Sequence, residues 1–383
     1  MNSNSVSQQG SAPQQPPSTT PALSRDVIRT APKAVLHEHL DGGLRPQTLI
    51  EIADEIGHTL PATEPEALAD WFFEAADSGT LERYLETFAH TVAVMQRPDD
   101  CFRIASEAAQ DLASDGVVYA ELRYAPEQQL LGGMSLEEVV EATLAGFEEG
   151  QRLAEQAGNP ITVRTLLCGM RHADRTLEIA ALAIAFRDKG VVGFDIAGGE
   201  IGNPAERHIE AFDLLRRASM PFTVHAGESM GPESIHGAVA ICGADRIGHG
   251  VQLIKDIDLT GDEPKLSPLA HYIRDRRIAL EICPSSNLQT EGAESIETHP
   301  IKALYDLGFR VTVNNDNRLM SRTHTSREFE LLSETFGWGW PEIKRCTENA
   351  MKASFLHHPE RRRILEEVIR PAYAALEASA QRP

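Results

Sequence analysis

Short apolar runs alternate with longer segments of helical periodicity through most of the chain. Runs of about four to eight apolar residues between turn residues are typical of buried strands, whereas apolar positions about three or four residues apart indicate helices. Strands are predicted at residues 34–40, 117–124, 161–168, 191–197, 221–228, 246–250, 278–283 and 310–314. Helices are predicted at residues 46–56, 65–95, 99–114, 135–157, 176–188, 204–218, 233–242, 266–276, 301–307 and 328–380.

Each predicted strand except the last is separated from the next strand by a helix. This alternation favours parallel pairing, and its repetition favours an α/β fold that closes into a (β/α)8 TIM barrel, with additional helices after the first strand and at the C-terminus. The alternative is an open doubly wound sheet. No Gly-x-Gly-x-x-Gly motif opens a helix after the first strand, and Gly198-Gly199 alone is weak support for that alternative.

The start of the chain differs in composition from the rest. Its residues are mainly Ser, Gln, Pro and Thr, which bury too little apolar surface to offset the entropy lost on ordering. We therefore expect residues 1–24 to be a disordered tail and residues 25–383 to form one barrel domain. The tail lacks the features of a secretory signal, and no stretch approaches the roughly 20 apolar residues of a membrane span. A cytoplasmic protein is expected.

The charge balance narrows the classes of partner. The chain has 57 acidic and 36 basic residues and a formal net charge of −21, which argues against nucleic acid and anionic membranes as partners. A neutral or cationic small molecule fits better. The cysteines at 101, 168, 242, 283 and 346 form neither a disulfide framework nor a Cys-x-x-Cys metal motif, so reduced thiols are expected. The oligomeric state is left open.

Polar residues gather where the predicted strands end. They are His37, His39 and Asp41 at the first strand, Asp195 and Gly198 at the fourth, His225 and Glu228 at the fifth, His249 at the sixth, and residues 314–317 at the eighth. In a closed barrel of this kind the carboxyl ends of the strands carry the functional side chains. His37 and His39 share one face of an extended strand, about 7 Å apart. Among 14 histidines this pair alone is weak evidence for a metal site. Its convergence with the polar residues at the other strand ends is much stronger evidence.

The side chains at these ends fit metal-assisted hydrolysis. His37, His39, His225 and Asp316 are a nitrogen and oxygen set suited to Zn²⁺ or another borderline divalent ion. Such an ion, with one position open, lowers the pKa of a bound water towards neutrality. His249 and Glu228 remain as the proton-handling pair. An alternative role for Glu228 is to cap the helix that opens near Met230.

Six segments together resemble the adenosine deaminases of the amidohydrolase superfamily. They are residues 32–42, 117–126, 195–198, 223–228, 246–250 and 314–316. The resemblance implies one zinc ion held by His37, His39, His225 and Asp316. It also implies that Glu228 protonates purine N1, and that His249, assisted by Asp316, orients and deprotonates the water that attacks C6. The products would be inosine, or deoxyinosine from 2′-deoxyadenosine, and ammonia.

Substrate contacts are implied for His39, Asp41, Gly198 and Asn317, with Gly198 N–H meeting N3 and Asp41 reaching the ribose. The chain departs from the family's usual Asn-Thr-Asp-Asp-Pro in its eighth strand end, where residues 314–318 read Asn-Asn-Asp-Asn-Arg. Asn317 has an NH₂ group that can donate to purine N7 without a shifted pKa. Asn315 is larger than threonine, and its amide could displace Asp316.

The sequence leaves several alternative substrates and functions open. Relatives that take free adenine tend to have Glu where this chain has Asp41, which favours a nucleoside over adenine. The chain also lacks a basic or Gly-rich cluster for a phosphate. Other readings are an adenine deaminase, another mononuclear metal-dependent amidohydrolase, and a non-catalytic binding homologue. A two-metal site is disfavoured because residues 195–198 lack a lysine.

Overall fold

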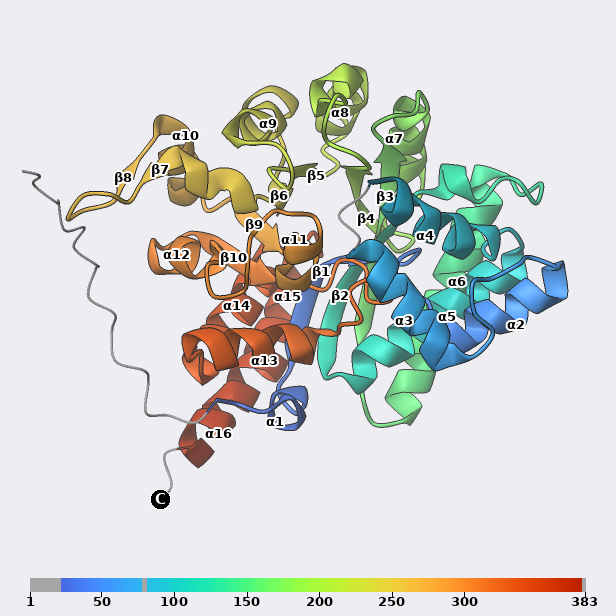
Figure 1. The fold of residues 1–383 in the computed structure, drawn as a ribbon, viewed down its shortest axis with the longest axis horizontal. Coiled ribbons are helices and arrows are strands. Elements are labelled where there is room, and N and C mark those ends of the chain that lie inside the picture. The colour runs from blue at the N-terminus through green and yellow to red at the C-terminus, as the bar shows by residue number, and fades with distance from the viewer. Residues whose placement is uncertain (1–21, 78–80, 381–383) are drawn as a thin grey trace, which may run out of the picture.

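The computed structural model describes residues 22–77 and 81–380. Eight parallel strands surround a central core (Figure 1). They are β1 (Lys33–His39), β2 (Val117–Tyr124), β3 (Thr162–Met170), β4 (Val191–Ala197), β5 (Thr223–Ala226), β6 (Arg246–His249), β9 (Ala279–Ile282) and β10 (Arg310–Val313). The bounds of each strand lie within two residues of the prediction, and β5 is two residues shorter than the predicted 221–228 at each end.

Backbone hydrogen bonds close the strands into a barrel. One run pairs in the order β1-β2-β3-β4 and the other in the order β5-β6-β9-β10, with every pair parallel. A parallel bridge between Phe194 and Phe222 joins β4 to β5, and one between Glu38 and Asp316 joins β1 to the end of β10. The (β/α)8 prediction is confirmed. Because the barrel interior and the helices cover both faces of each strand, all seven residues of β1 are buried.

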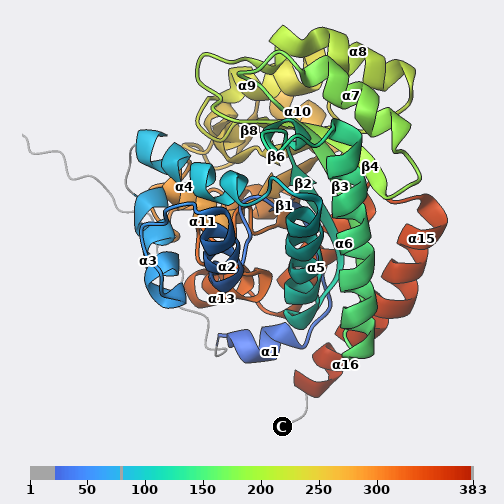
Figure 2. The ribbon, with the colours of Figure 1, turned by 90° about the vertical axis from the view of Figure 1, so that its right-hand side faces the viewer.

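An outer ring of helices surrounds the barrel, and Figure 2 shows α5 and α6 side by side in it. The ring includes α5 (Pro98–Ser114), α6 (Leu136–Gln156), α7 (Thr176–Ala185), α8 (Ile209–Arg217), α9 (Pro232–His236), the π-helical turn η3 (Gly237–Cys242), α10 (Pro268–Asp275), α12 (Ile301–Asp306), α13 (Thr325–Phe336) and α14 (Trp340–Ala353). A capping box of Ser135 and Glu138 opens α6, with both of its hydrogen bonds formed.

The structure differs from the sequence prediction in several connections. The predicted helix 65–95 is two helices, α3 (Pro65–Ala76) and α4 (Leu81–Ala93), which follow α2 (Pro46–Ile56). Elements that were not predicted are α1 (Arg25–Arg29), the turn η1 (Pro126–Gln128), a hairpin of β7 (Ile257–Asp258) and β8 (Lys265–Leu266), the turn η4 (Val251–Asp256) and α11 (Pro284–Gln289). The predicted helix 328–380 is divided into α13, α14, α15 (His358–Arg363), η5 (Ile364–Ile369) and α16 (Arg370–Ala380).

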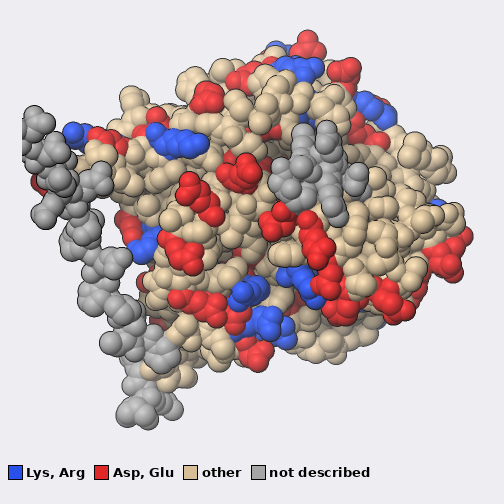
Figure 3. Space-filling model, in the orientation of Figure 1, with Lys and Arg blue, Asp and Glu red and all other residues tan. Residues whose placement is uncertain are grey.

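The ends of the chain and its surface bear on the remaining predictions. Residues 1–21 of the predicted tail lie outside the described residues, and the amide of Leu23 donates to Ser333 Oγ on α13 at 2.8 Å. Acidic side chains are spread over the face shown in Figure 3, with fewer basic ones among them. Among the described helices, none has the length and apolar content needed to cross a membrane. The cytoplasmic location stays a prediction.

Candidate active site

The four predicted metal ligands meet at the carboxyl ends of β1, β5 and β10. His39 Nε2 lies 3.2 Å from His225 Nε2 and 3.4 Å from Asp316 Oδ1. His37 Nε2 lies 3.5 Å from the same Asp316 oxygen. The other Asp316 oxygen accepts a 2.6 Å hydrogen bond from Ser286 Oγ, which fixes the carboxylate. Three imidazole nitrogens and one oxygen therefore converge.

These atoms fit a divalent metal. Two nitrogen ligands at the usual zinc distance in a tetrahedral shell are roughly 3.3 Å apart, close to the spacing of the His39 and His225 nitrogens. His37 Nε2 is buried and has no hydrogen-bond partner among the described residues. A buried imidazole nitrogen without a partner is costly unless an ion or proton donor meets it.

Carboxylates lie within hydrogen-bond distance of the Nδ1 atoms of two of these rings, on the side away from the common centre. Glu281 Oε2 on β9 lies 3.0 Å from His37 Nδ1, and Asp195 Oδ2 on β4 lies 3.0 Å from His225 Nδ1. The buried Arg123 guanidinium on β2 donates to both carboxylates. This outer layer turns the Nε2 atoms towards the common centre, as is usual around metal-bound histidines. Sequence reasoning missed Glu281 and Arg123, although a charged residue inside an apolar strand was a usable signal.

His249 lies against the same cluster but has different neighbours. Its ring centroid is 4.6 Å from that of His37, and its Nε2 is 3.5 Å from Glu228 Oε2. The Asn287 side-chain amide donates to Nδ1 at 3.1 Å, whereas carboxylates face Nδ1 of His37 and His225. The ligand atoms of His37, His225 and His249 lie within 4.8 Å of one another, and it is the Asn287 amide at Nδ1 and the Glu228 carboxyl at Nε2 that distinguish His249 from the predicted ligands.

Two residues of the site have unusual backbone conformations. His249 has φ 62° and Asp316 has φ 61°, both in the left-handed region that non-glycine residues rarely adopt. Such conformations persist only where the surrounding structure holds them, and they are concentrated at functional sites. They turn both side chains from the strand ends into the shared centre.

Glu228 follows β5 and is largely buried. Burial, followed by the negative charges of Asp316 and Glu200, raises the pKa of Glu228 to about 8. The alternative role as a helix cap is wrong: α9 begins at Pro232 with Gly231 at its N-cap, and the amides of Ser229 and Met230 donate to Glu200. The raised pKa favours the protonated carboxyl, and Glu228 Oε2 faces His249 Nε2.

The predicted substrate-binding residues line the same end of the barrel. Asp41 is buried, its Oδ1 has no hydrogen-bond partner among the described residues, and burial raises its pKa to about 7. Gly198, at the end of β4, has φ 99°, which favours glycine. A Cβ added at Gly42 would lie 1.9 Å from Asn317 Oδ1, so only glycine leaves room for that amide.

The structure accounts for the departures at residues 315 and 318. Asn315 Nδ2 donates to Glu38 Oε2 at 2.7 Å, and Arg318 Nε donates to Glu38 Oε1. Arg318 also donates to the Gly43 carbonyl at 3.1 Å. Asp316 is held independently, because its amide and carbonyl both bond to the backbone of β1. The larger Asn315 amide is thus directed to Glu38 and away from the predicted metal ligands.

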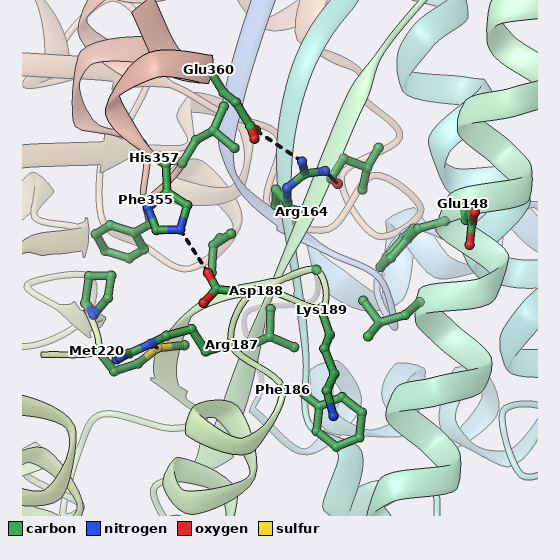
Figure 4. A pocket seen from close by; sticks show the side chains of 18 of the residues that line it. Glu148, Arg164, Phe186, Arg187, Asp188, Lys189, Met220, Phe355, His357 and Glu360 are labelled. Atoms are coloured by element: carbon green, nitrogen blue, oxygen red, sulfur yellow. Dashed lines mark hydrogen bonds and ion pairs between the residues drawn. The ribbon is translucent and has the colours of Figure 1, made fainter. Parts of the chain in front are cut away.

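A cavity at the other end of the barrel, at the amino ends of β3 and β4, is a separate feature (Figure 4). Its volume is about 940 Å³, and none of the predicted site residues lines it. Two ion pairs cross its wall, Arg164 with Glu360 and His357 with Asp188. Catalytic groups of such barrels lie at the carboxyl ends, so this cavity is not the active site.

Known proteins are similar to this chain in sequence and in fold. The chain matches the adenosine deaminase family model over residues 32–371. An adenosine deaminase from Mycobacterium avium (strain 104) is 55% identical over 363 residues, which cover 93% of this chain and 99% of that protein. The structure of arabidopsis ADAL complexed with IMP has a TM-score of 0.76 and 26% identity, covering 91% of this chain and 98% of that one. An amidohydrolase from Burkholderia ambifaria with bound Zn has a TM-score of 0.79 and 22% identity, covering 94% and 96%, and supports the fold.

Proposed function

This chain belongs to the adenosine deaminase family and deaminates adenosine, and we propose that the residues at the carboxyl ends of its strands carry out the reaction. The observation that carries this proposal is the meeting of His39, His225 and Asp316 beside the Glu228 and His249 pair. The family uses a metal cofactor. Its donor set of imidazole nitrogens and one carboxylate oxygen suits Zn²⁺, and we assign one zinc ion to His37, His39, His225 and Asp316.

A zinc ion bound there supplies a water acidified towards neutral pH as the nucleophile. Glu228, held as a carboxylic acid by burial and nearby negative charge, donates a proton to purine N1. Protonation at N1 makes C6 electrophilic, so that water adds at C6. The proton that the water gives up passes to the 6-amino group, which leaves as ammonia, and the proton of the added hydroxyl returns to Glu228 to give inosine.

His249 and Asp316 manage the attacking water. Because the Asn287 amide donates to Nδ1 of His249, the neutral ring carries its proton on Nε2, the atom that faces the site. We therefore assign His249 the orienting role, in which it donates to the water. The Asp316 carboxylate is the group that accepts the water's proton, which differs from the deprotonation by His249 that the sequence resemblance implies.

The remaining residues hold the substrate. Gly198 N–H is assigned to purine N3, the Asn317 amide to N7, and Asp41 to the ribose of adenosine or 2′-deoxyadenosine. Asp41 Oδ1 supports this role, because it is buried, has no hydrogen-bond partner among the described residues and lies 3.8 Å from His39 Nδ1, so that a ligand hydroxyl can satisfy it. The ADAL structure contains a nucleotide, IMP. For this chain the net charge of −21 favours an uncharged nucleoside.

The assay that tests this function follows the loss of adenine absorbance with adenosine, 2′-deoxyadenosine, adenine and AMP as substrates. Metal-replete protein should turn over both nucleosides with kcat/KM at least about 100-fold above that for adenine and AMP. Turnover confined to adenine or AMP would overturn the nucleoside assignment. Absence of turnover with all four would overturn the residue roles and leave a binding protein.

A further inference from the structure

Glu200 binds the loop that carries the catalytic acid. Its carboxylate accepts hydrogen bonds from the amides of Gly227 at 2.7 Å, Ser229 at 2.9 Å and Met230 at 2.8 Å. Ser234 Oγ donates to it as well. Glu200 is only 7% exposed. The three amides surround Glu228 in the chain, so one carboxylate fixes the backbone on both sides of that residue.

The backbone N–H groups of this loop depend on the Glu200 carboxylate as their hydrogen-bond acceptor. Residues 227–231 form an irregular connection between β5 and α9, and buried amides outside a helix or sheet need another acceptor. An ionised carboxylate offers two oxygens with several acceptor positions, whereas a neutral amide side chain would turn an NH₂ donor against these N–H groups. Gly227 is required at the start of this loop, because its φ is 69° and a Cβ there would lie 2.4 Å from the Ile235 side chain.

Glu200 also connects two parts of the proposed substrate site. It lies two residues after Gly198, which is assigned to purine N3, while Glu228 is assigned to N1. A hydrogen-bonded link between these loops fixes the distance between two groups that contact the same ring. We propose that Glu200 is a positioning residue that holds the Glu228 loop so that the Glu228 carboxyl points at the purine. This inference rests on the proposed function.

The charge of Glu200 acts in the same direction as its hydrogen bonds. Glu200 is the third cause of the raised pKa of Glu228, after burial and the charge of Asp316. The Arg171 guanidinium is the nearby cation, and it donates to the His225 carbonyl at 2.5 Å. A single acidic residue thus orients the acid and favours its protonated form.

A double-mutant cycle between Glu200 and Glu228 tests the proposal. The variants are Glu200→Gln, Glu228→Gln and the double variant, with Ser234→Ala as a matched control that removes a Glu200 contact outside the three amides. For each, kcat and KM for adenosine, zinc content and inosine affinity are measured. Glu200→Gln should lower kcat about 30-fold, while KM, zinc content and inosine affinity stay within about threefold. Ser234→Ala should stay within about threefold of wild type in every measurement.

The cycle separates a role through Glu228 from an independent one. In the Glu228→Gln background the added Glu200→Gln change should lower residual turnover less than about threefold, because the orientation of a missing acid no longer matters. An equal 30-fold loss in both backgrounds, an unchanged kcat, or a loss of zinc would overturn the proposal. If Glu200→Gln does not fold, Glu200→Asp replaces it in the cycle. Failure of the proposed function would appear in the wild type itself, as absent turnover of adenosine.

Discussion

His39 Nε2 and His225 Nε2 lie 3.2 Å apart, although the two residues are 186 positions apart in the chain. Two neutral imidazole nitrogens at this distance need a shared proton or a shared ion, because lone pairs facing each other repel. The carboxylate behind His225 and the orphan Nε2 of His37 both favour the ion.

Metal removal should therefore abolish catalysis. Dialysis against a strong chelator is expected to remove one metal ion per chain and nearly all turnover of adenosine, and zinc should restore both. His39→Ala should lower bound zinc at least about tenfold in elemental analysis. The control is His357→Ala, in the cavity at the amino end, which should keep its metal. Full activity in chelated protein with no bound metal would contradict the assignment.

Replacing the proposed acid should separate chemistry from metal binding. Glu228→Gln removes the proton donor while keeping the shape of the side chain, so kcat should fall by about 10²- to 10⁴-fold. Zinc content should not change, because Glu228 is not in the proposed ligand set. Retained turnover, measured with adenosine at saturation, would refute proton donation by this residue.

The rate should decline on the alkaline side of neutrality. Burial raises the pKa of Glu228 to about 8, and the protonated form is the active one. As pH rises through that value the acid loses its proton, so kcat/KM should fall about tenfold per pH unit above it. The measurement is a profile of kcat/KM against pH, with return to neutral pH as a check for unfolding. A flat alkaline profile would argue against Glu228 as the acid.

Truncating Asp41 should weaken nucleoside binding selectively. If its carboxyl meets a ribose hydroxyl, Asp41→Ala should raise KM for adenosine about tenfold or more, with the inhibition constant of adenine changed less than about threefold. Asp41→Asn serves as a matched control that keeps the volume and an acceptor oxygen. Equal losses for nucleoside and base would remove the ribose assignment.

The buried ion pair between Arg318 and Glu38 should stabilise the folded protein. Both side chains are nearly inaccessible, at 11% and 0% exposure, so Arg318→Met leaves a buried carboxylate without its cation. The free energy of unfolding should fall by about 3 kcal/mol at neutral pH. Burial raises the pKa of Glu38, so the variant takes up a proton as pH falls and the deficit should shrink in mild acid. Denaturant titration at both pH values measures this.

The paired variant supplies the control for that prediction. Glu38→Gln combined with Arg318→Met removes both charges and should recover at least half of the lost stability at neutral pH. A double variant as unstable as Arg318→Met alone would show that the loss came from packing of the arginine side chain.

The barrel was predictable from local pattern because each of its strands is buried on both faces. The eight barrel strands are mainly apolar runs between turn residues, interrupted by a few buried polar side chains, and this pattern can be recognised without knowledge of neighbouring strands. The short hairpin of β7 and β8 and the helix α11 were missed, since two-residue strands and a helix of one or two turns leave almost no periodicity.

The sequence by itself determined which residues we propose as metal ligands and acid, because the residue types that bind metals and transfer protons stand at strand ends. Closure of the barrel brings those ends together. The tertiary structure decided what surrounds them. Glu281 on β9 contacts His37 Nδ1 on β1. Glu200 accepts hydrogen bonds from the backbone amides next to Glu228, so Glu228 faces His249 and does not cap α9. Such contacts join side chains from strands and loops far apart in the chain, and no spacing in the sequence encodes the distance between them.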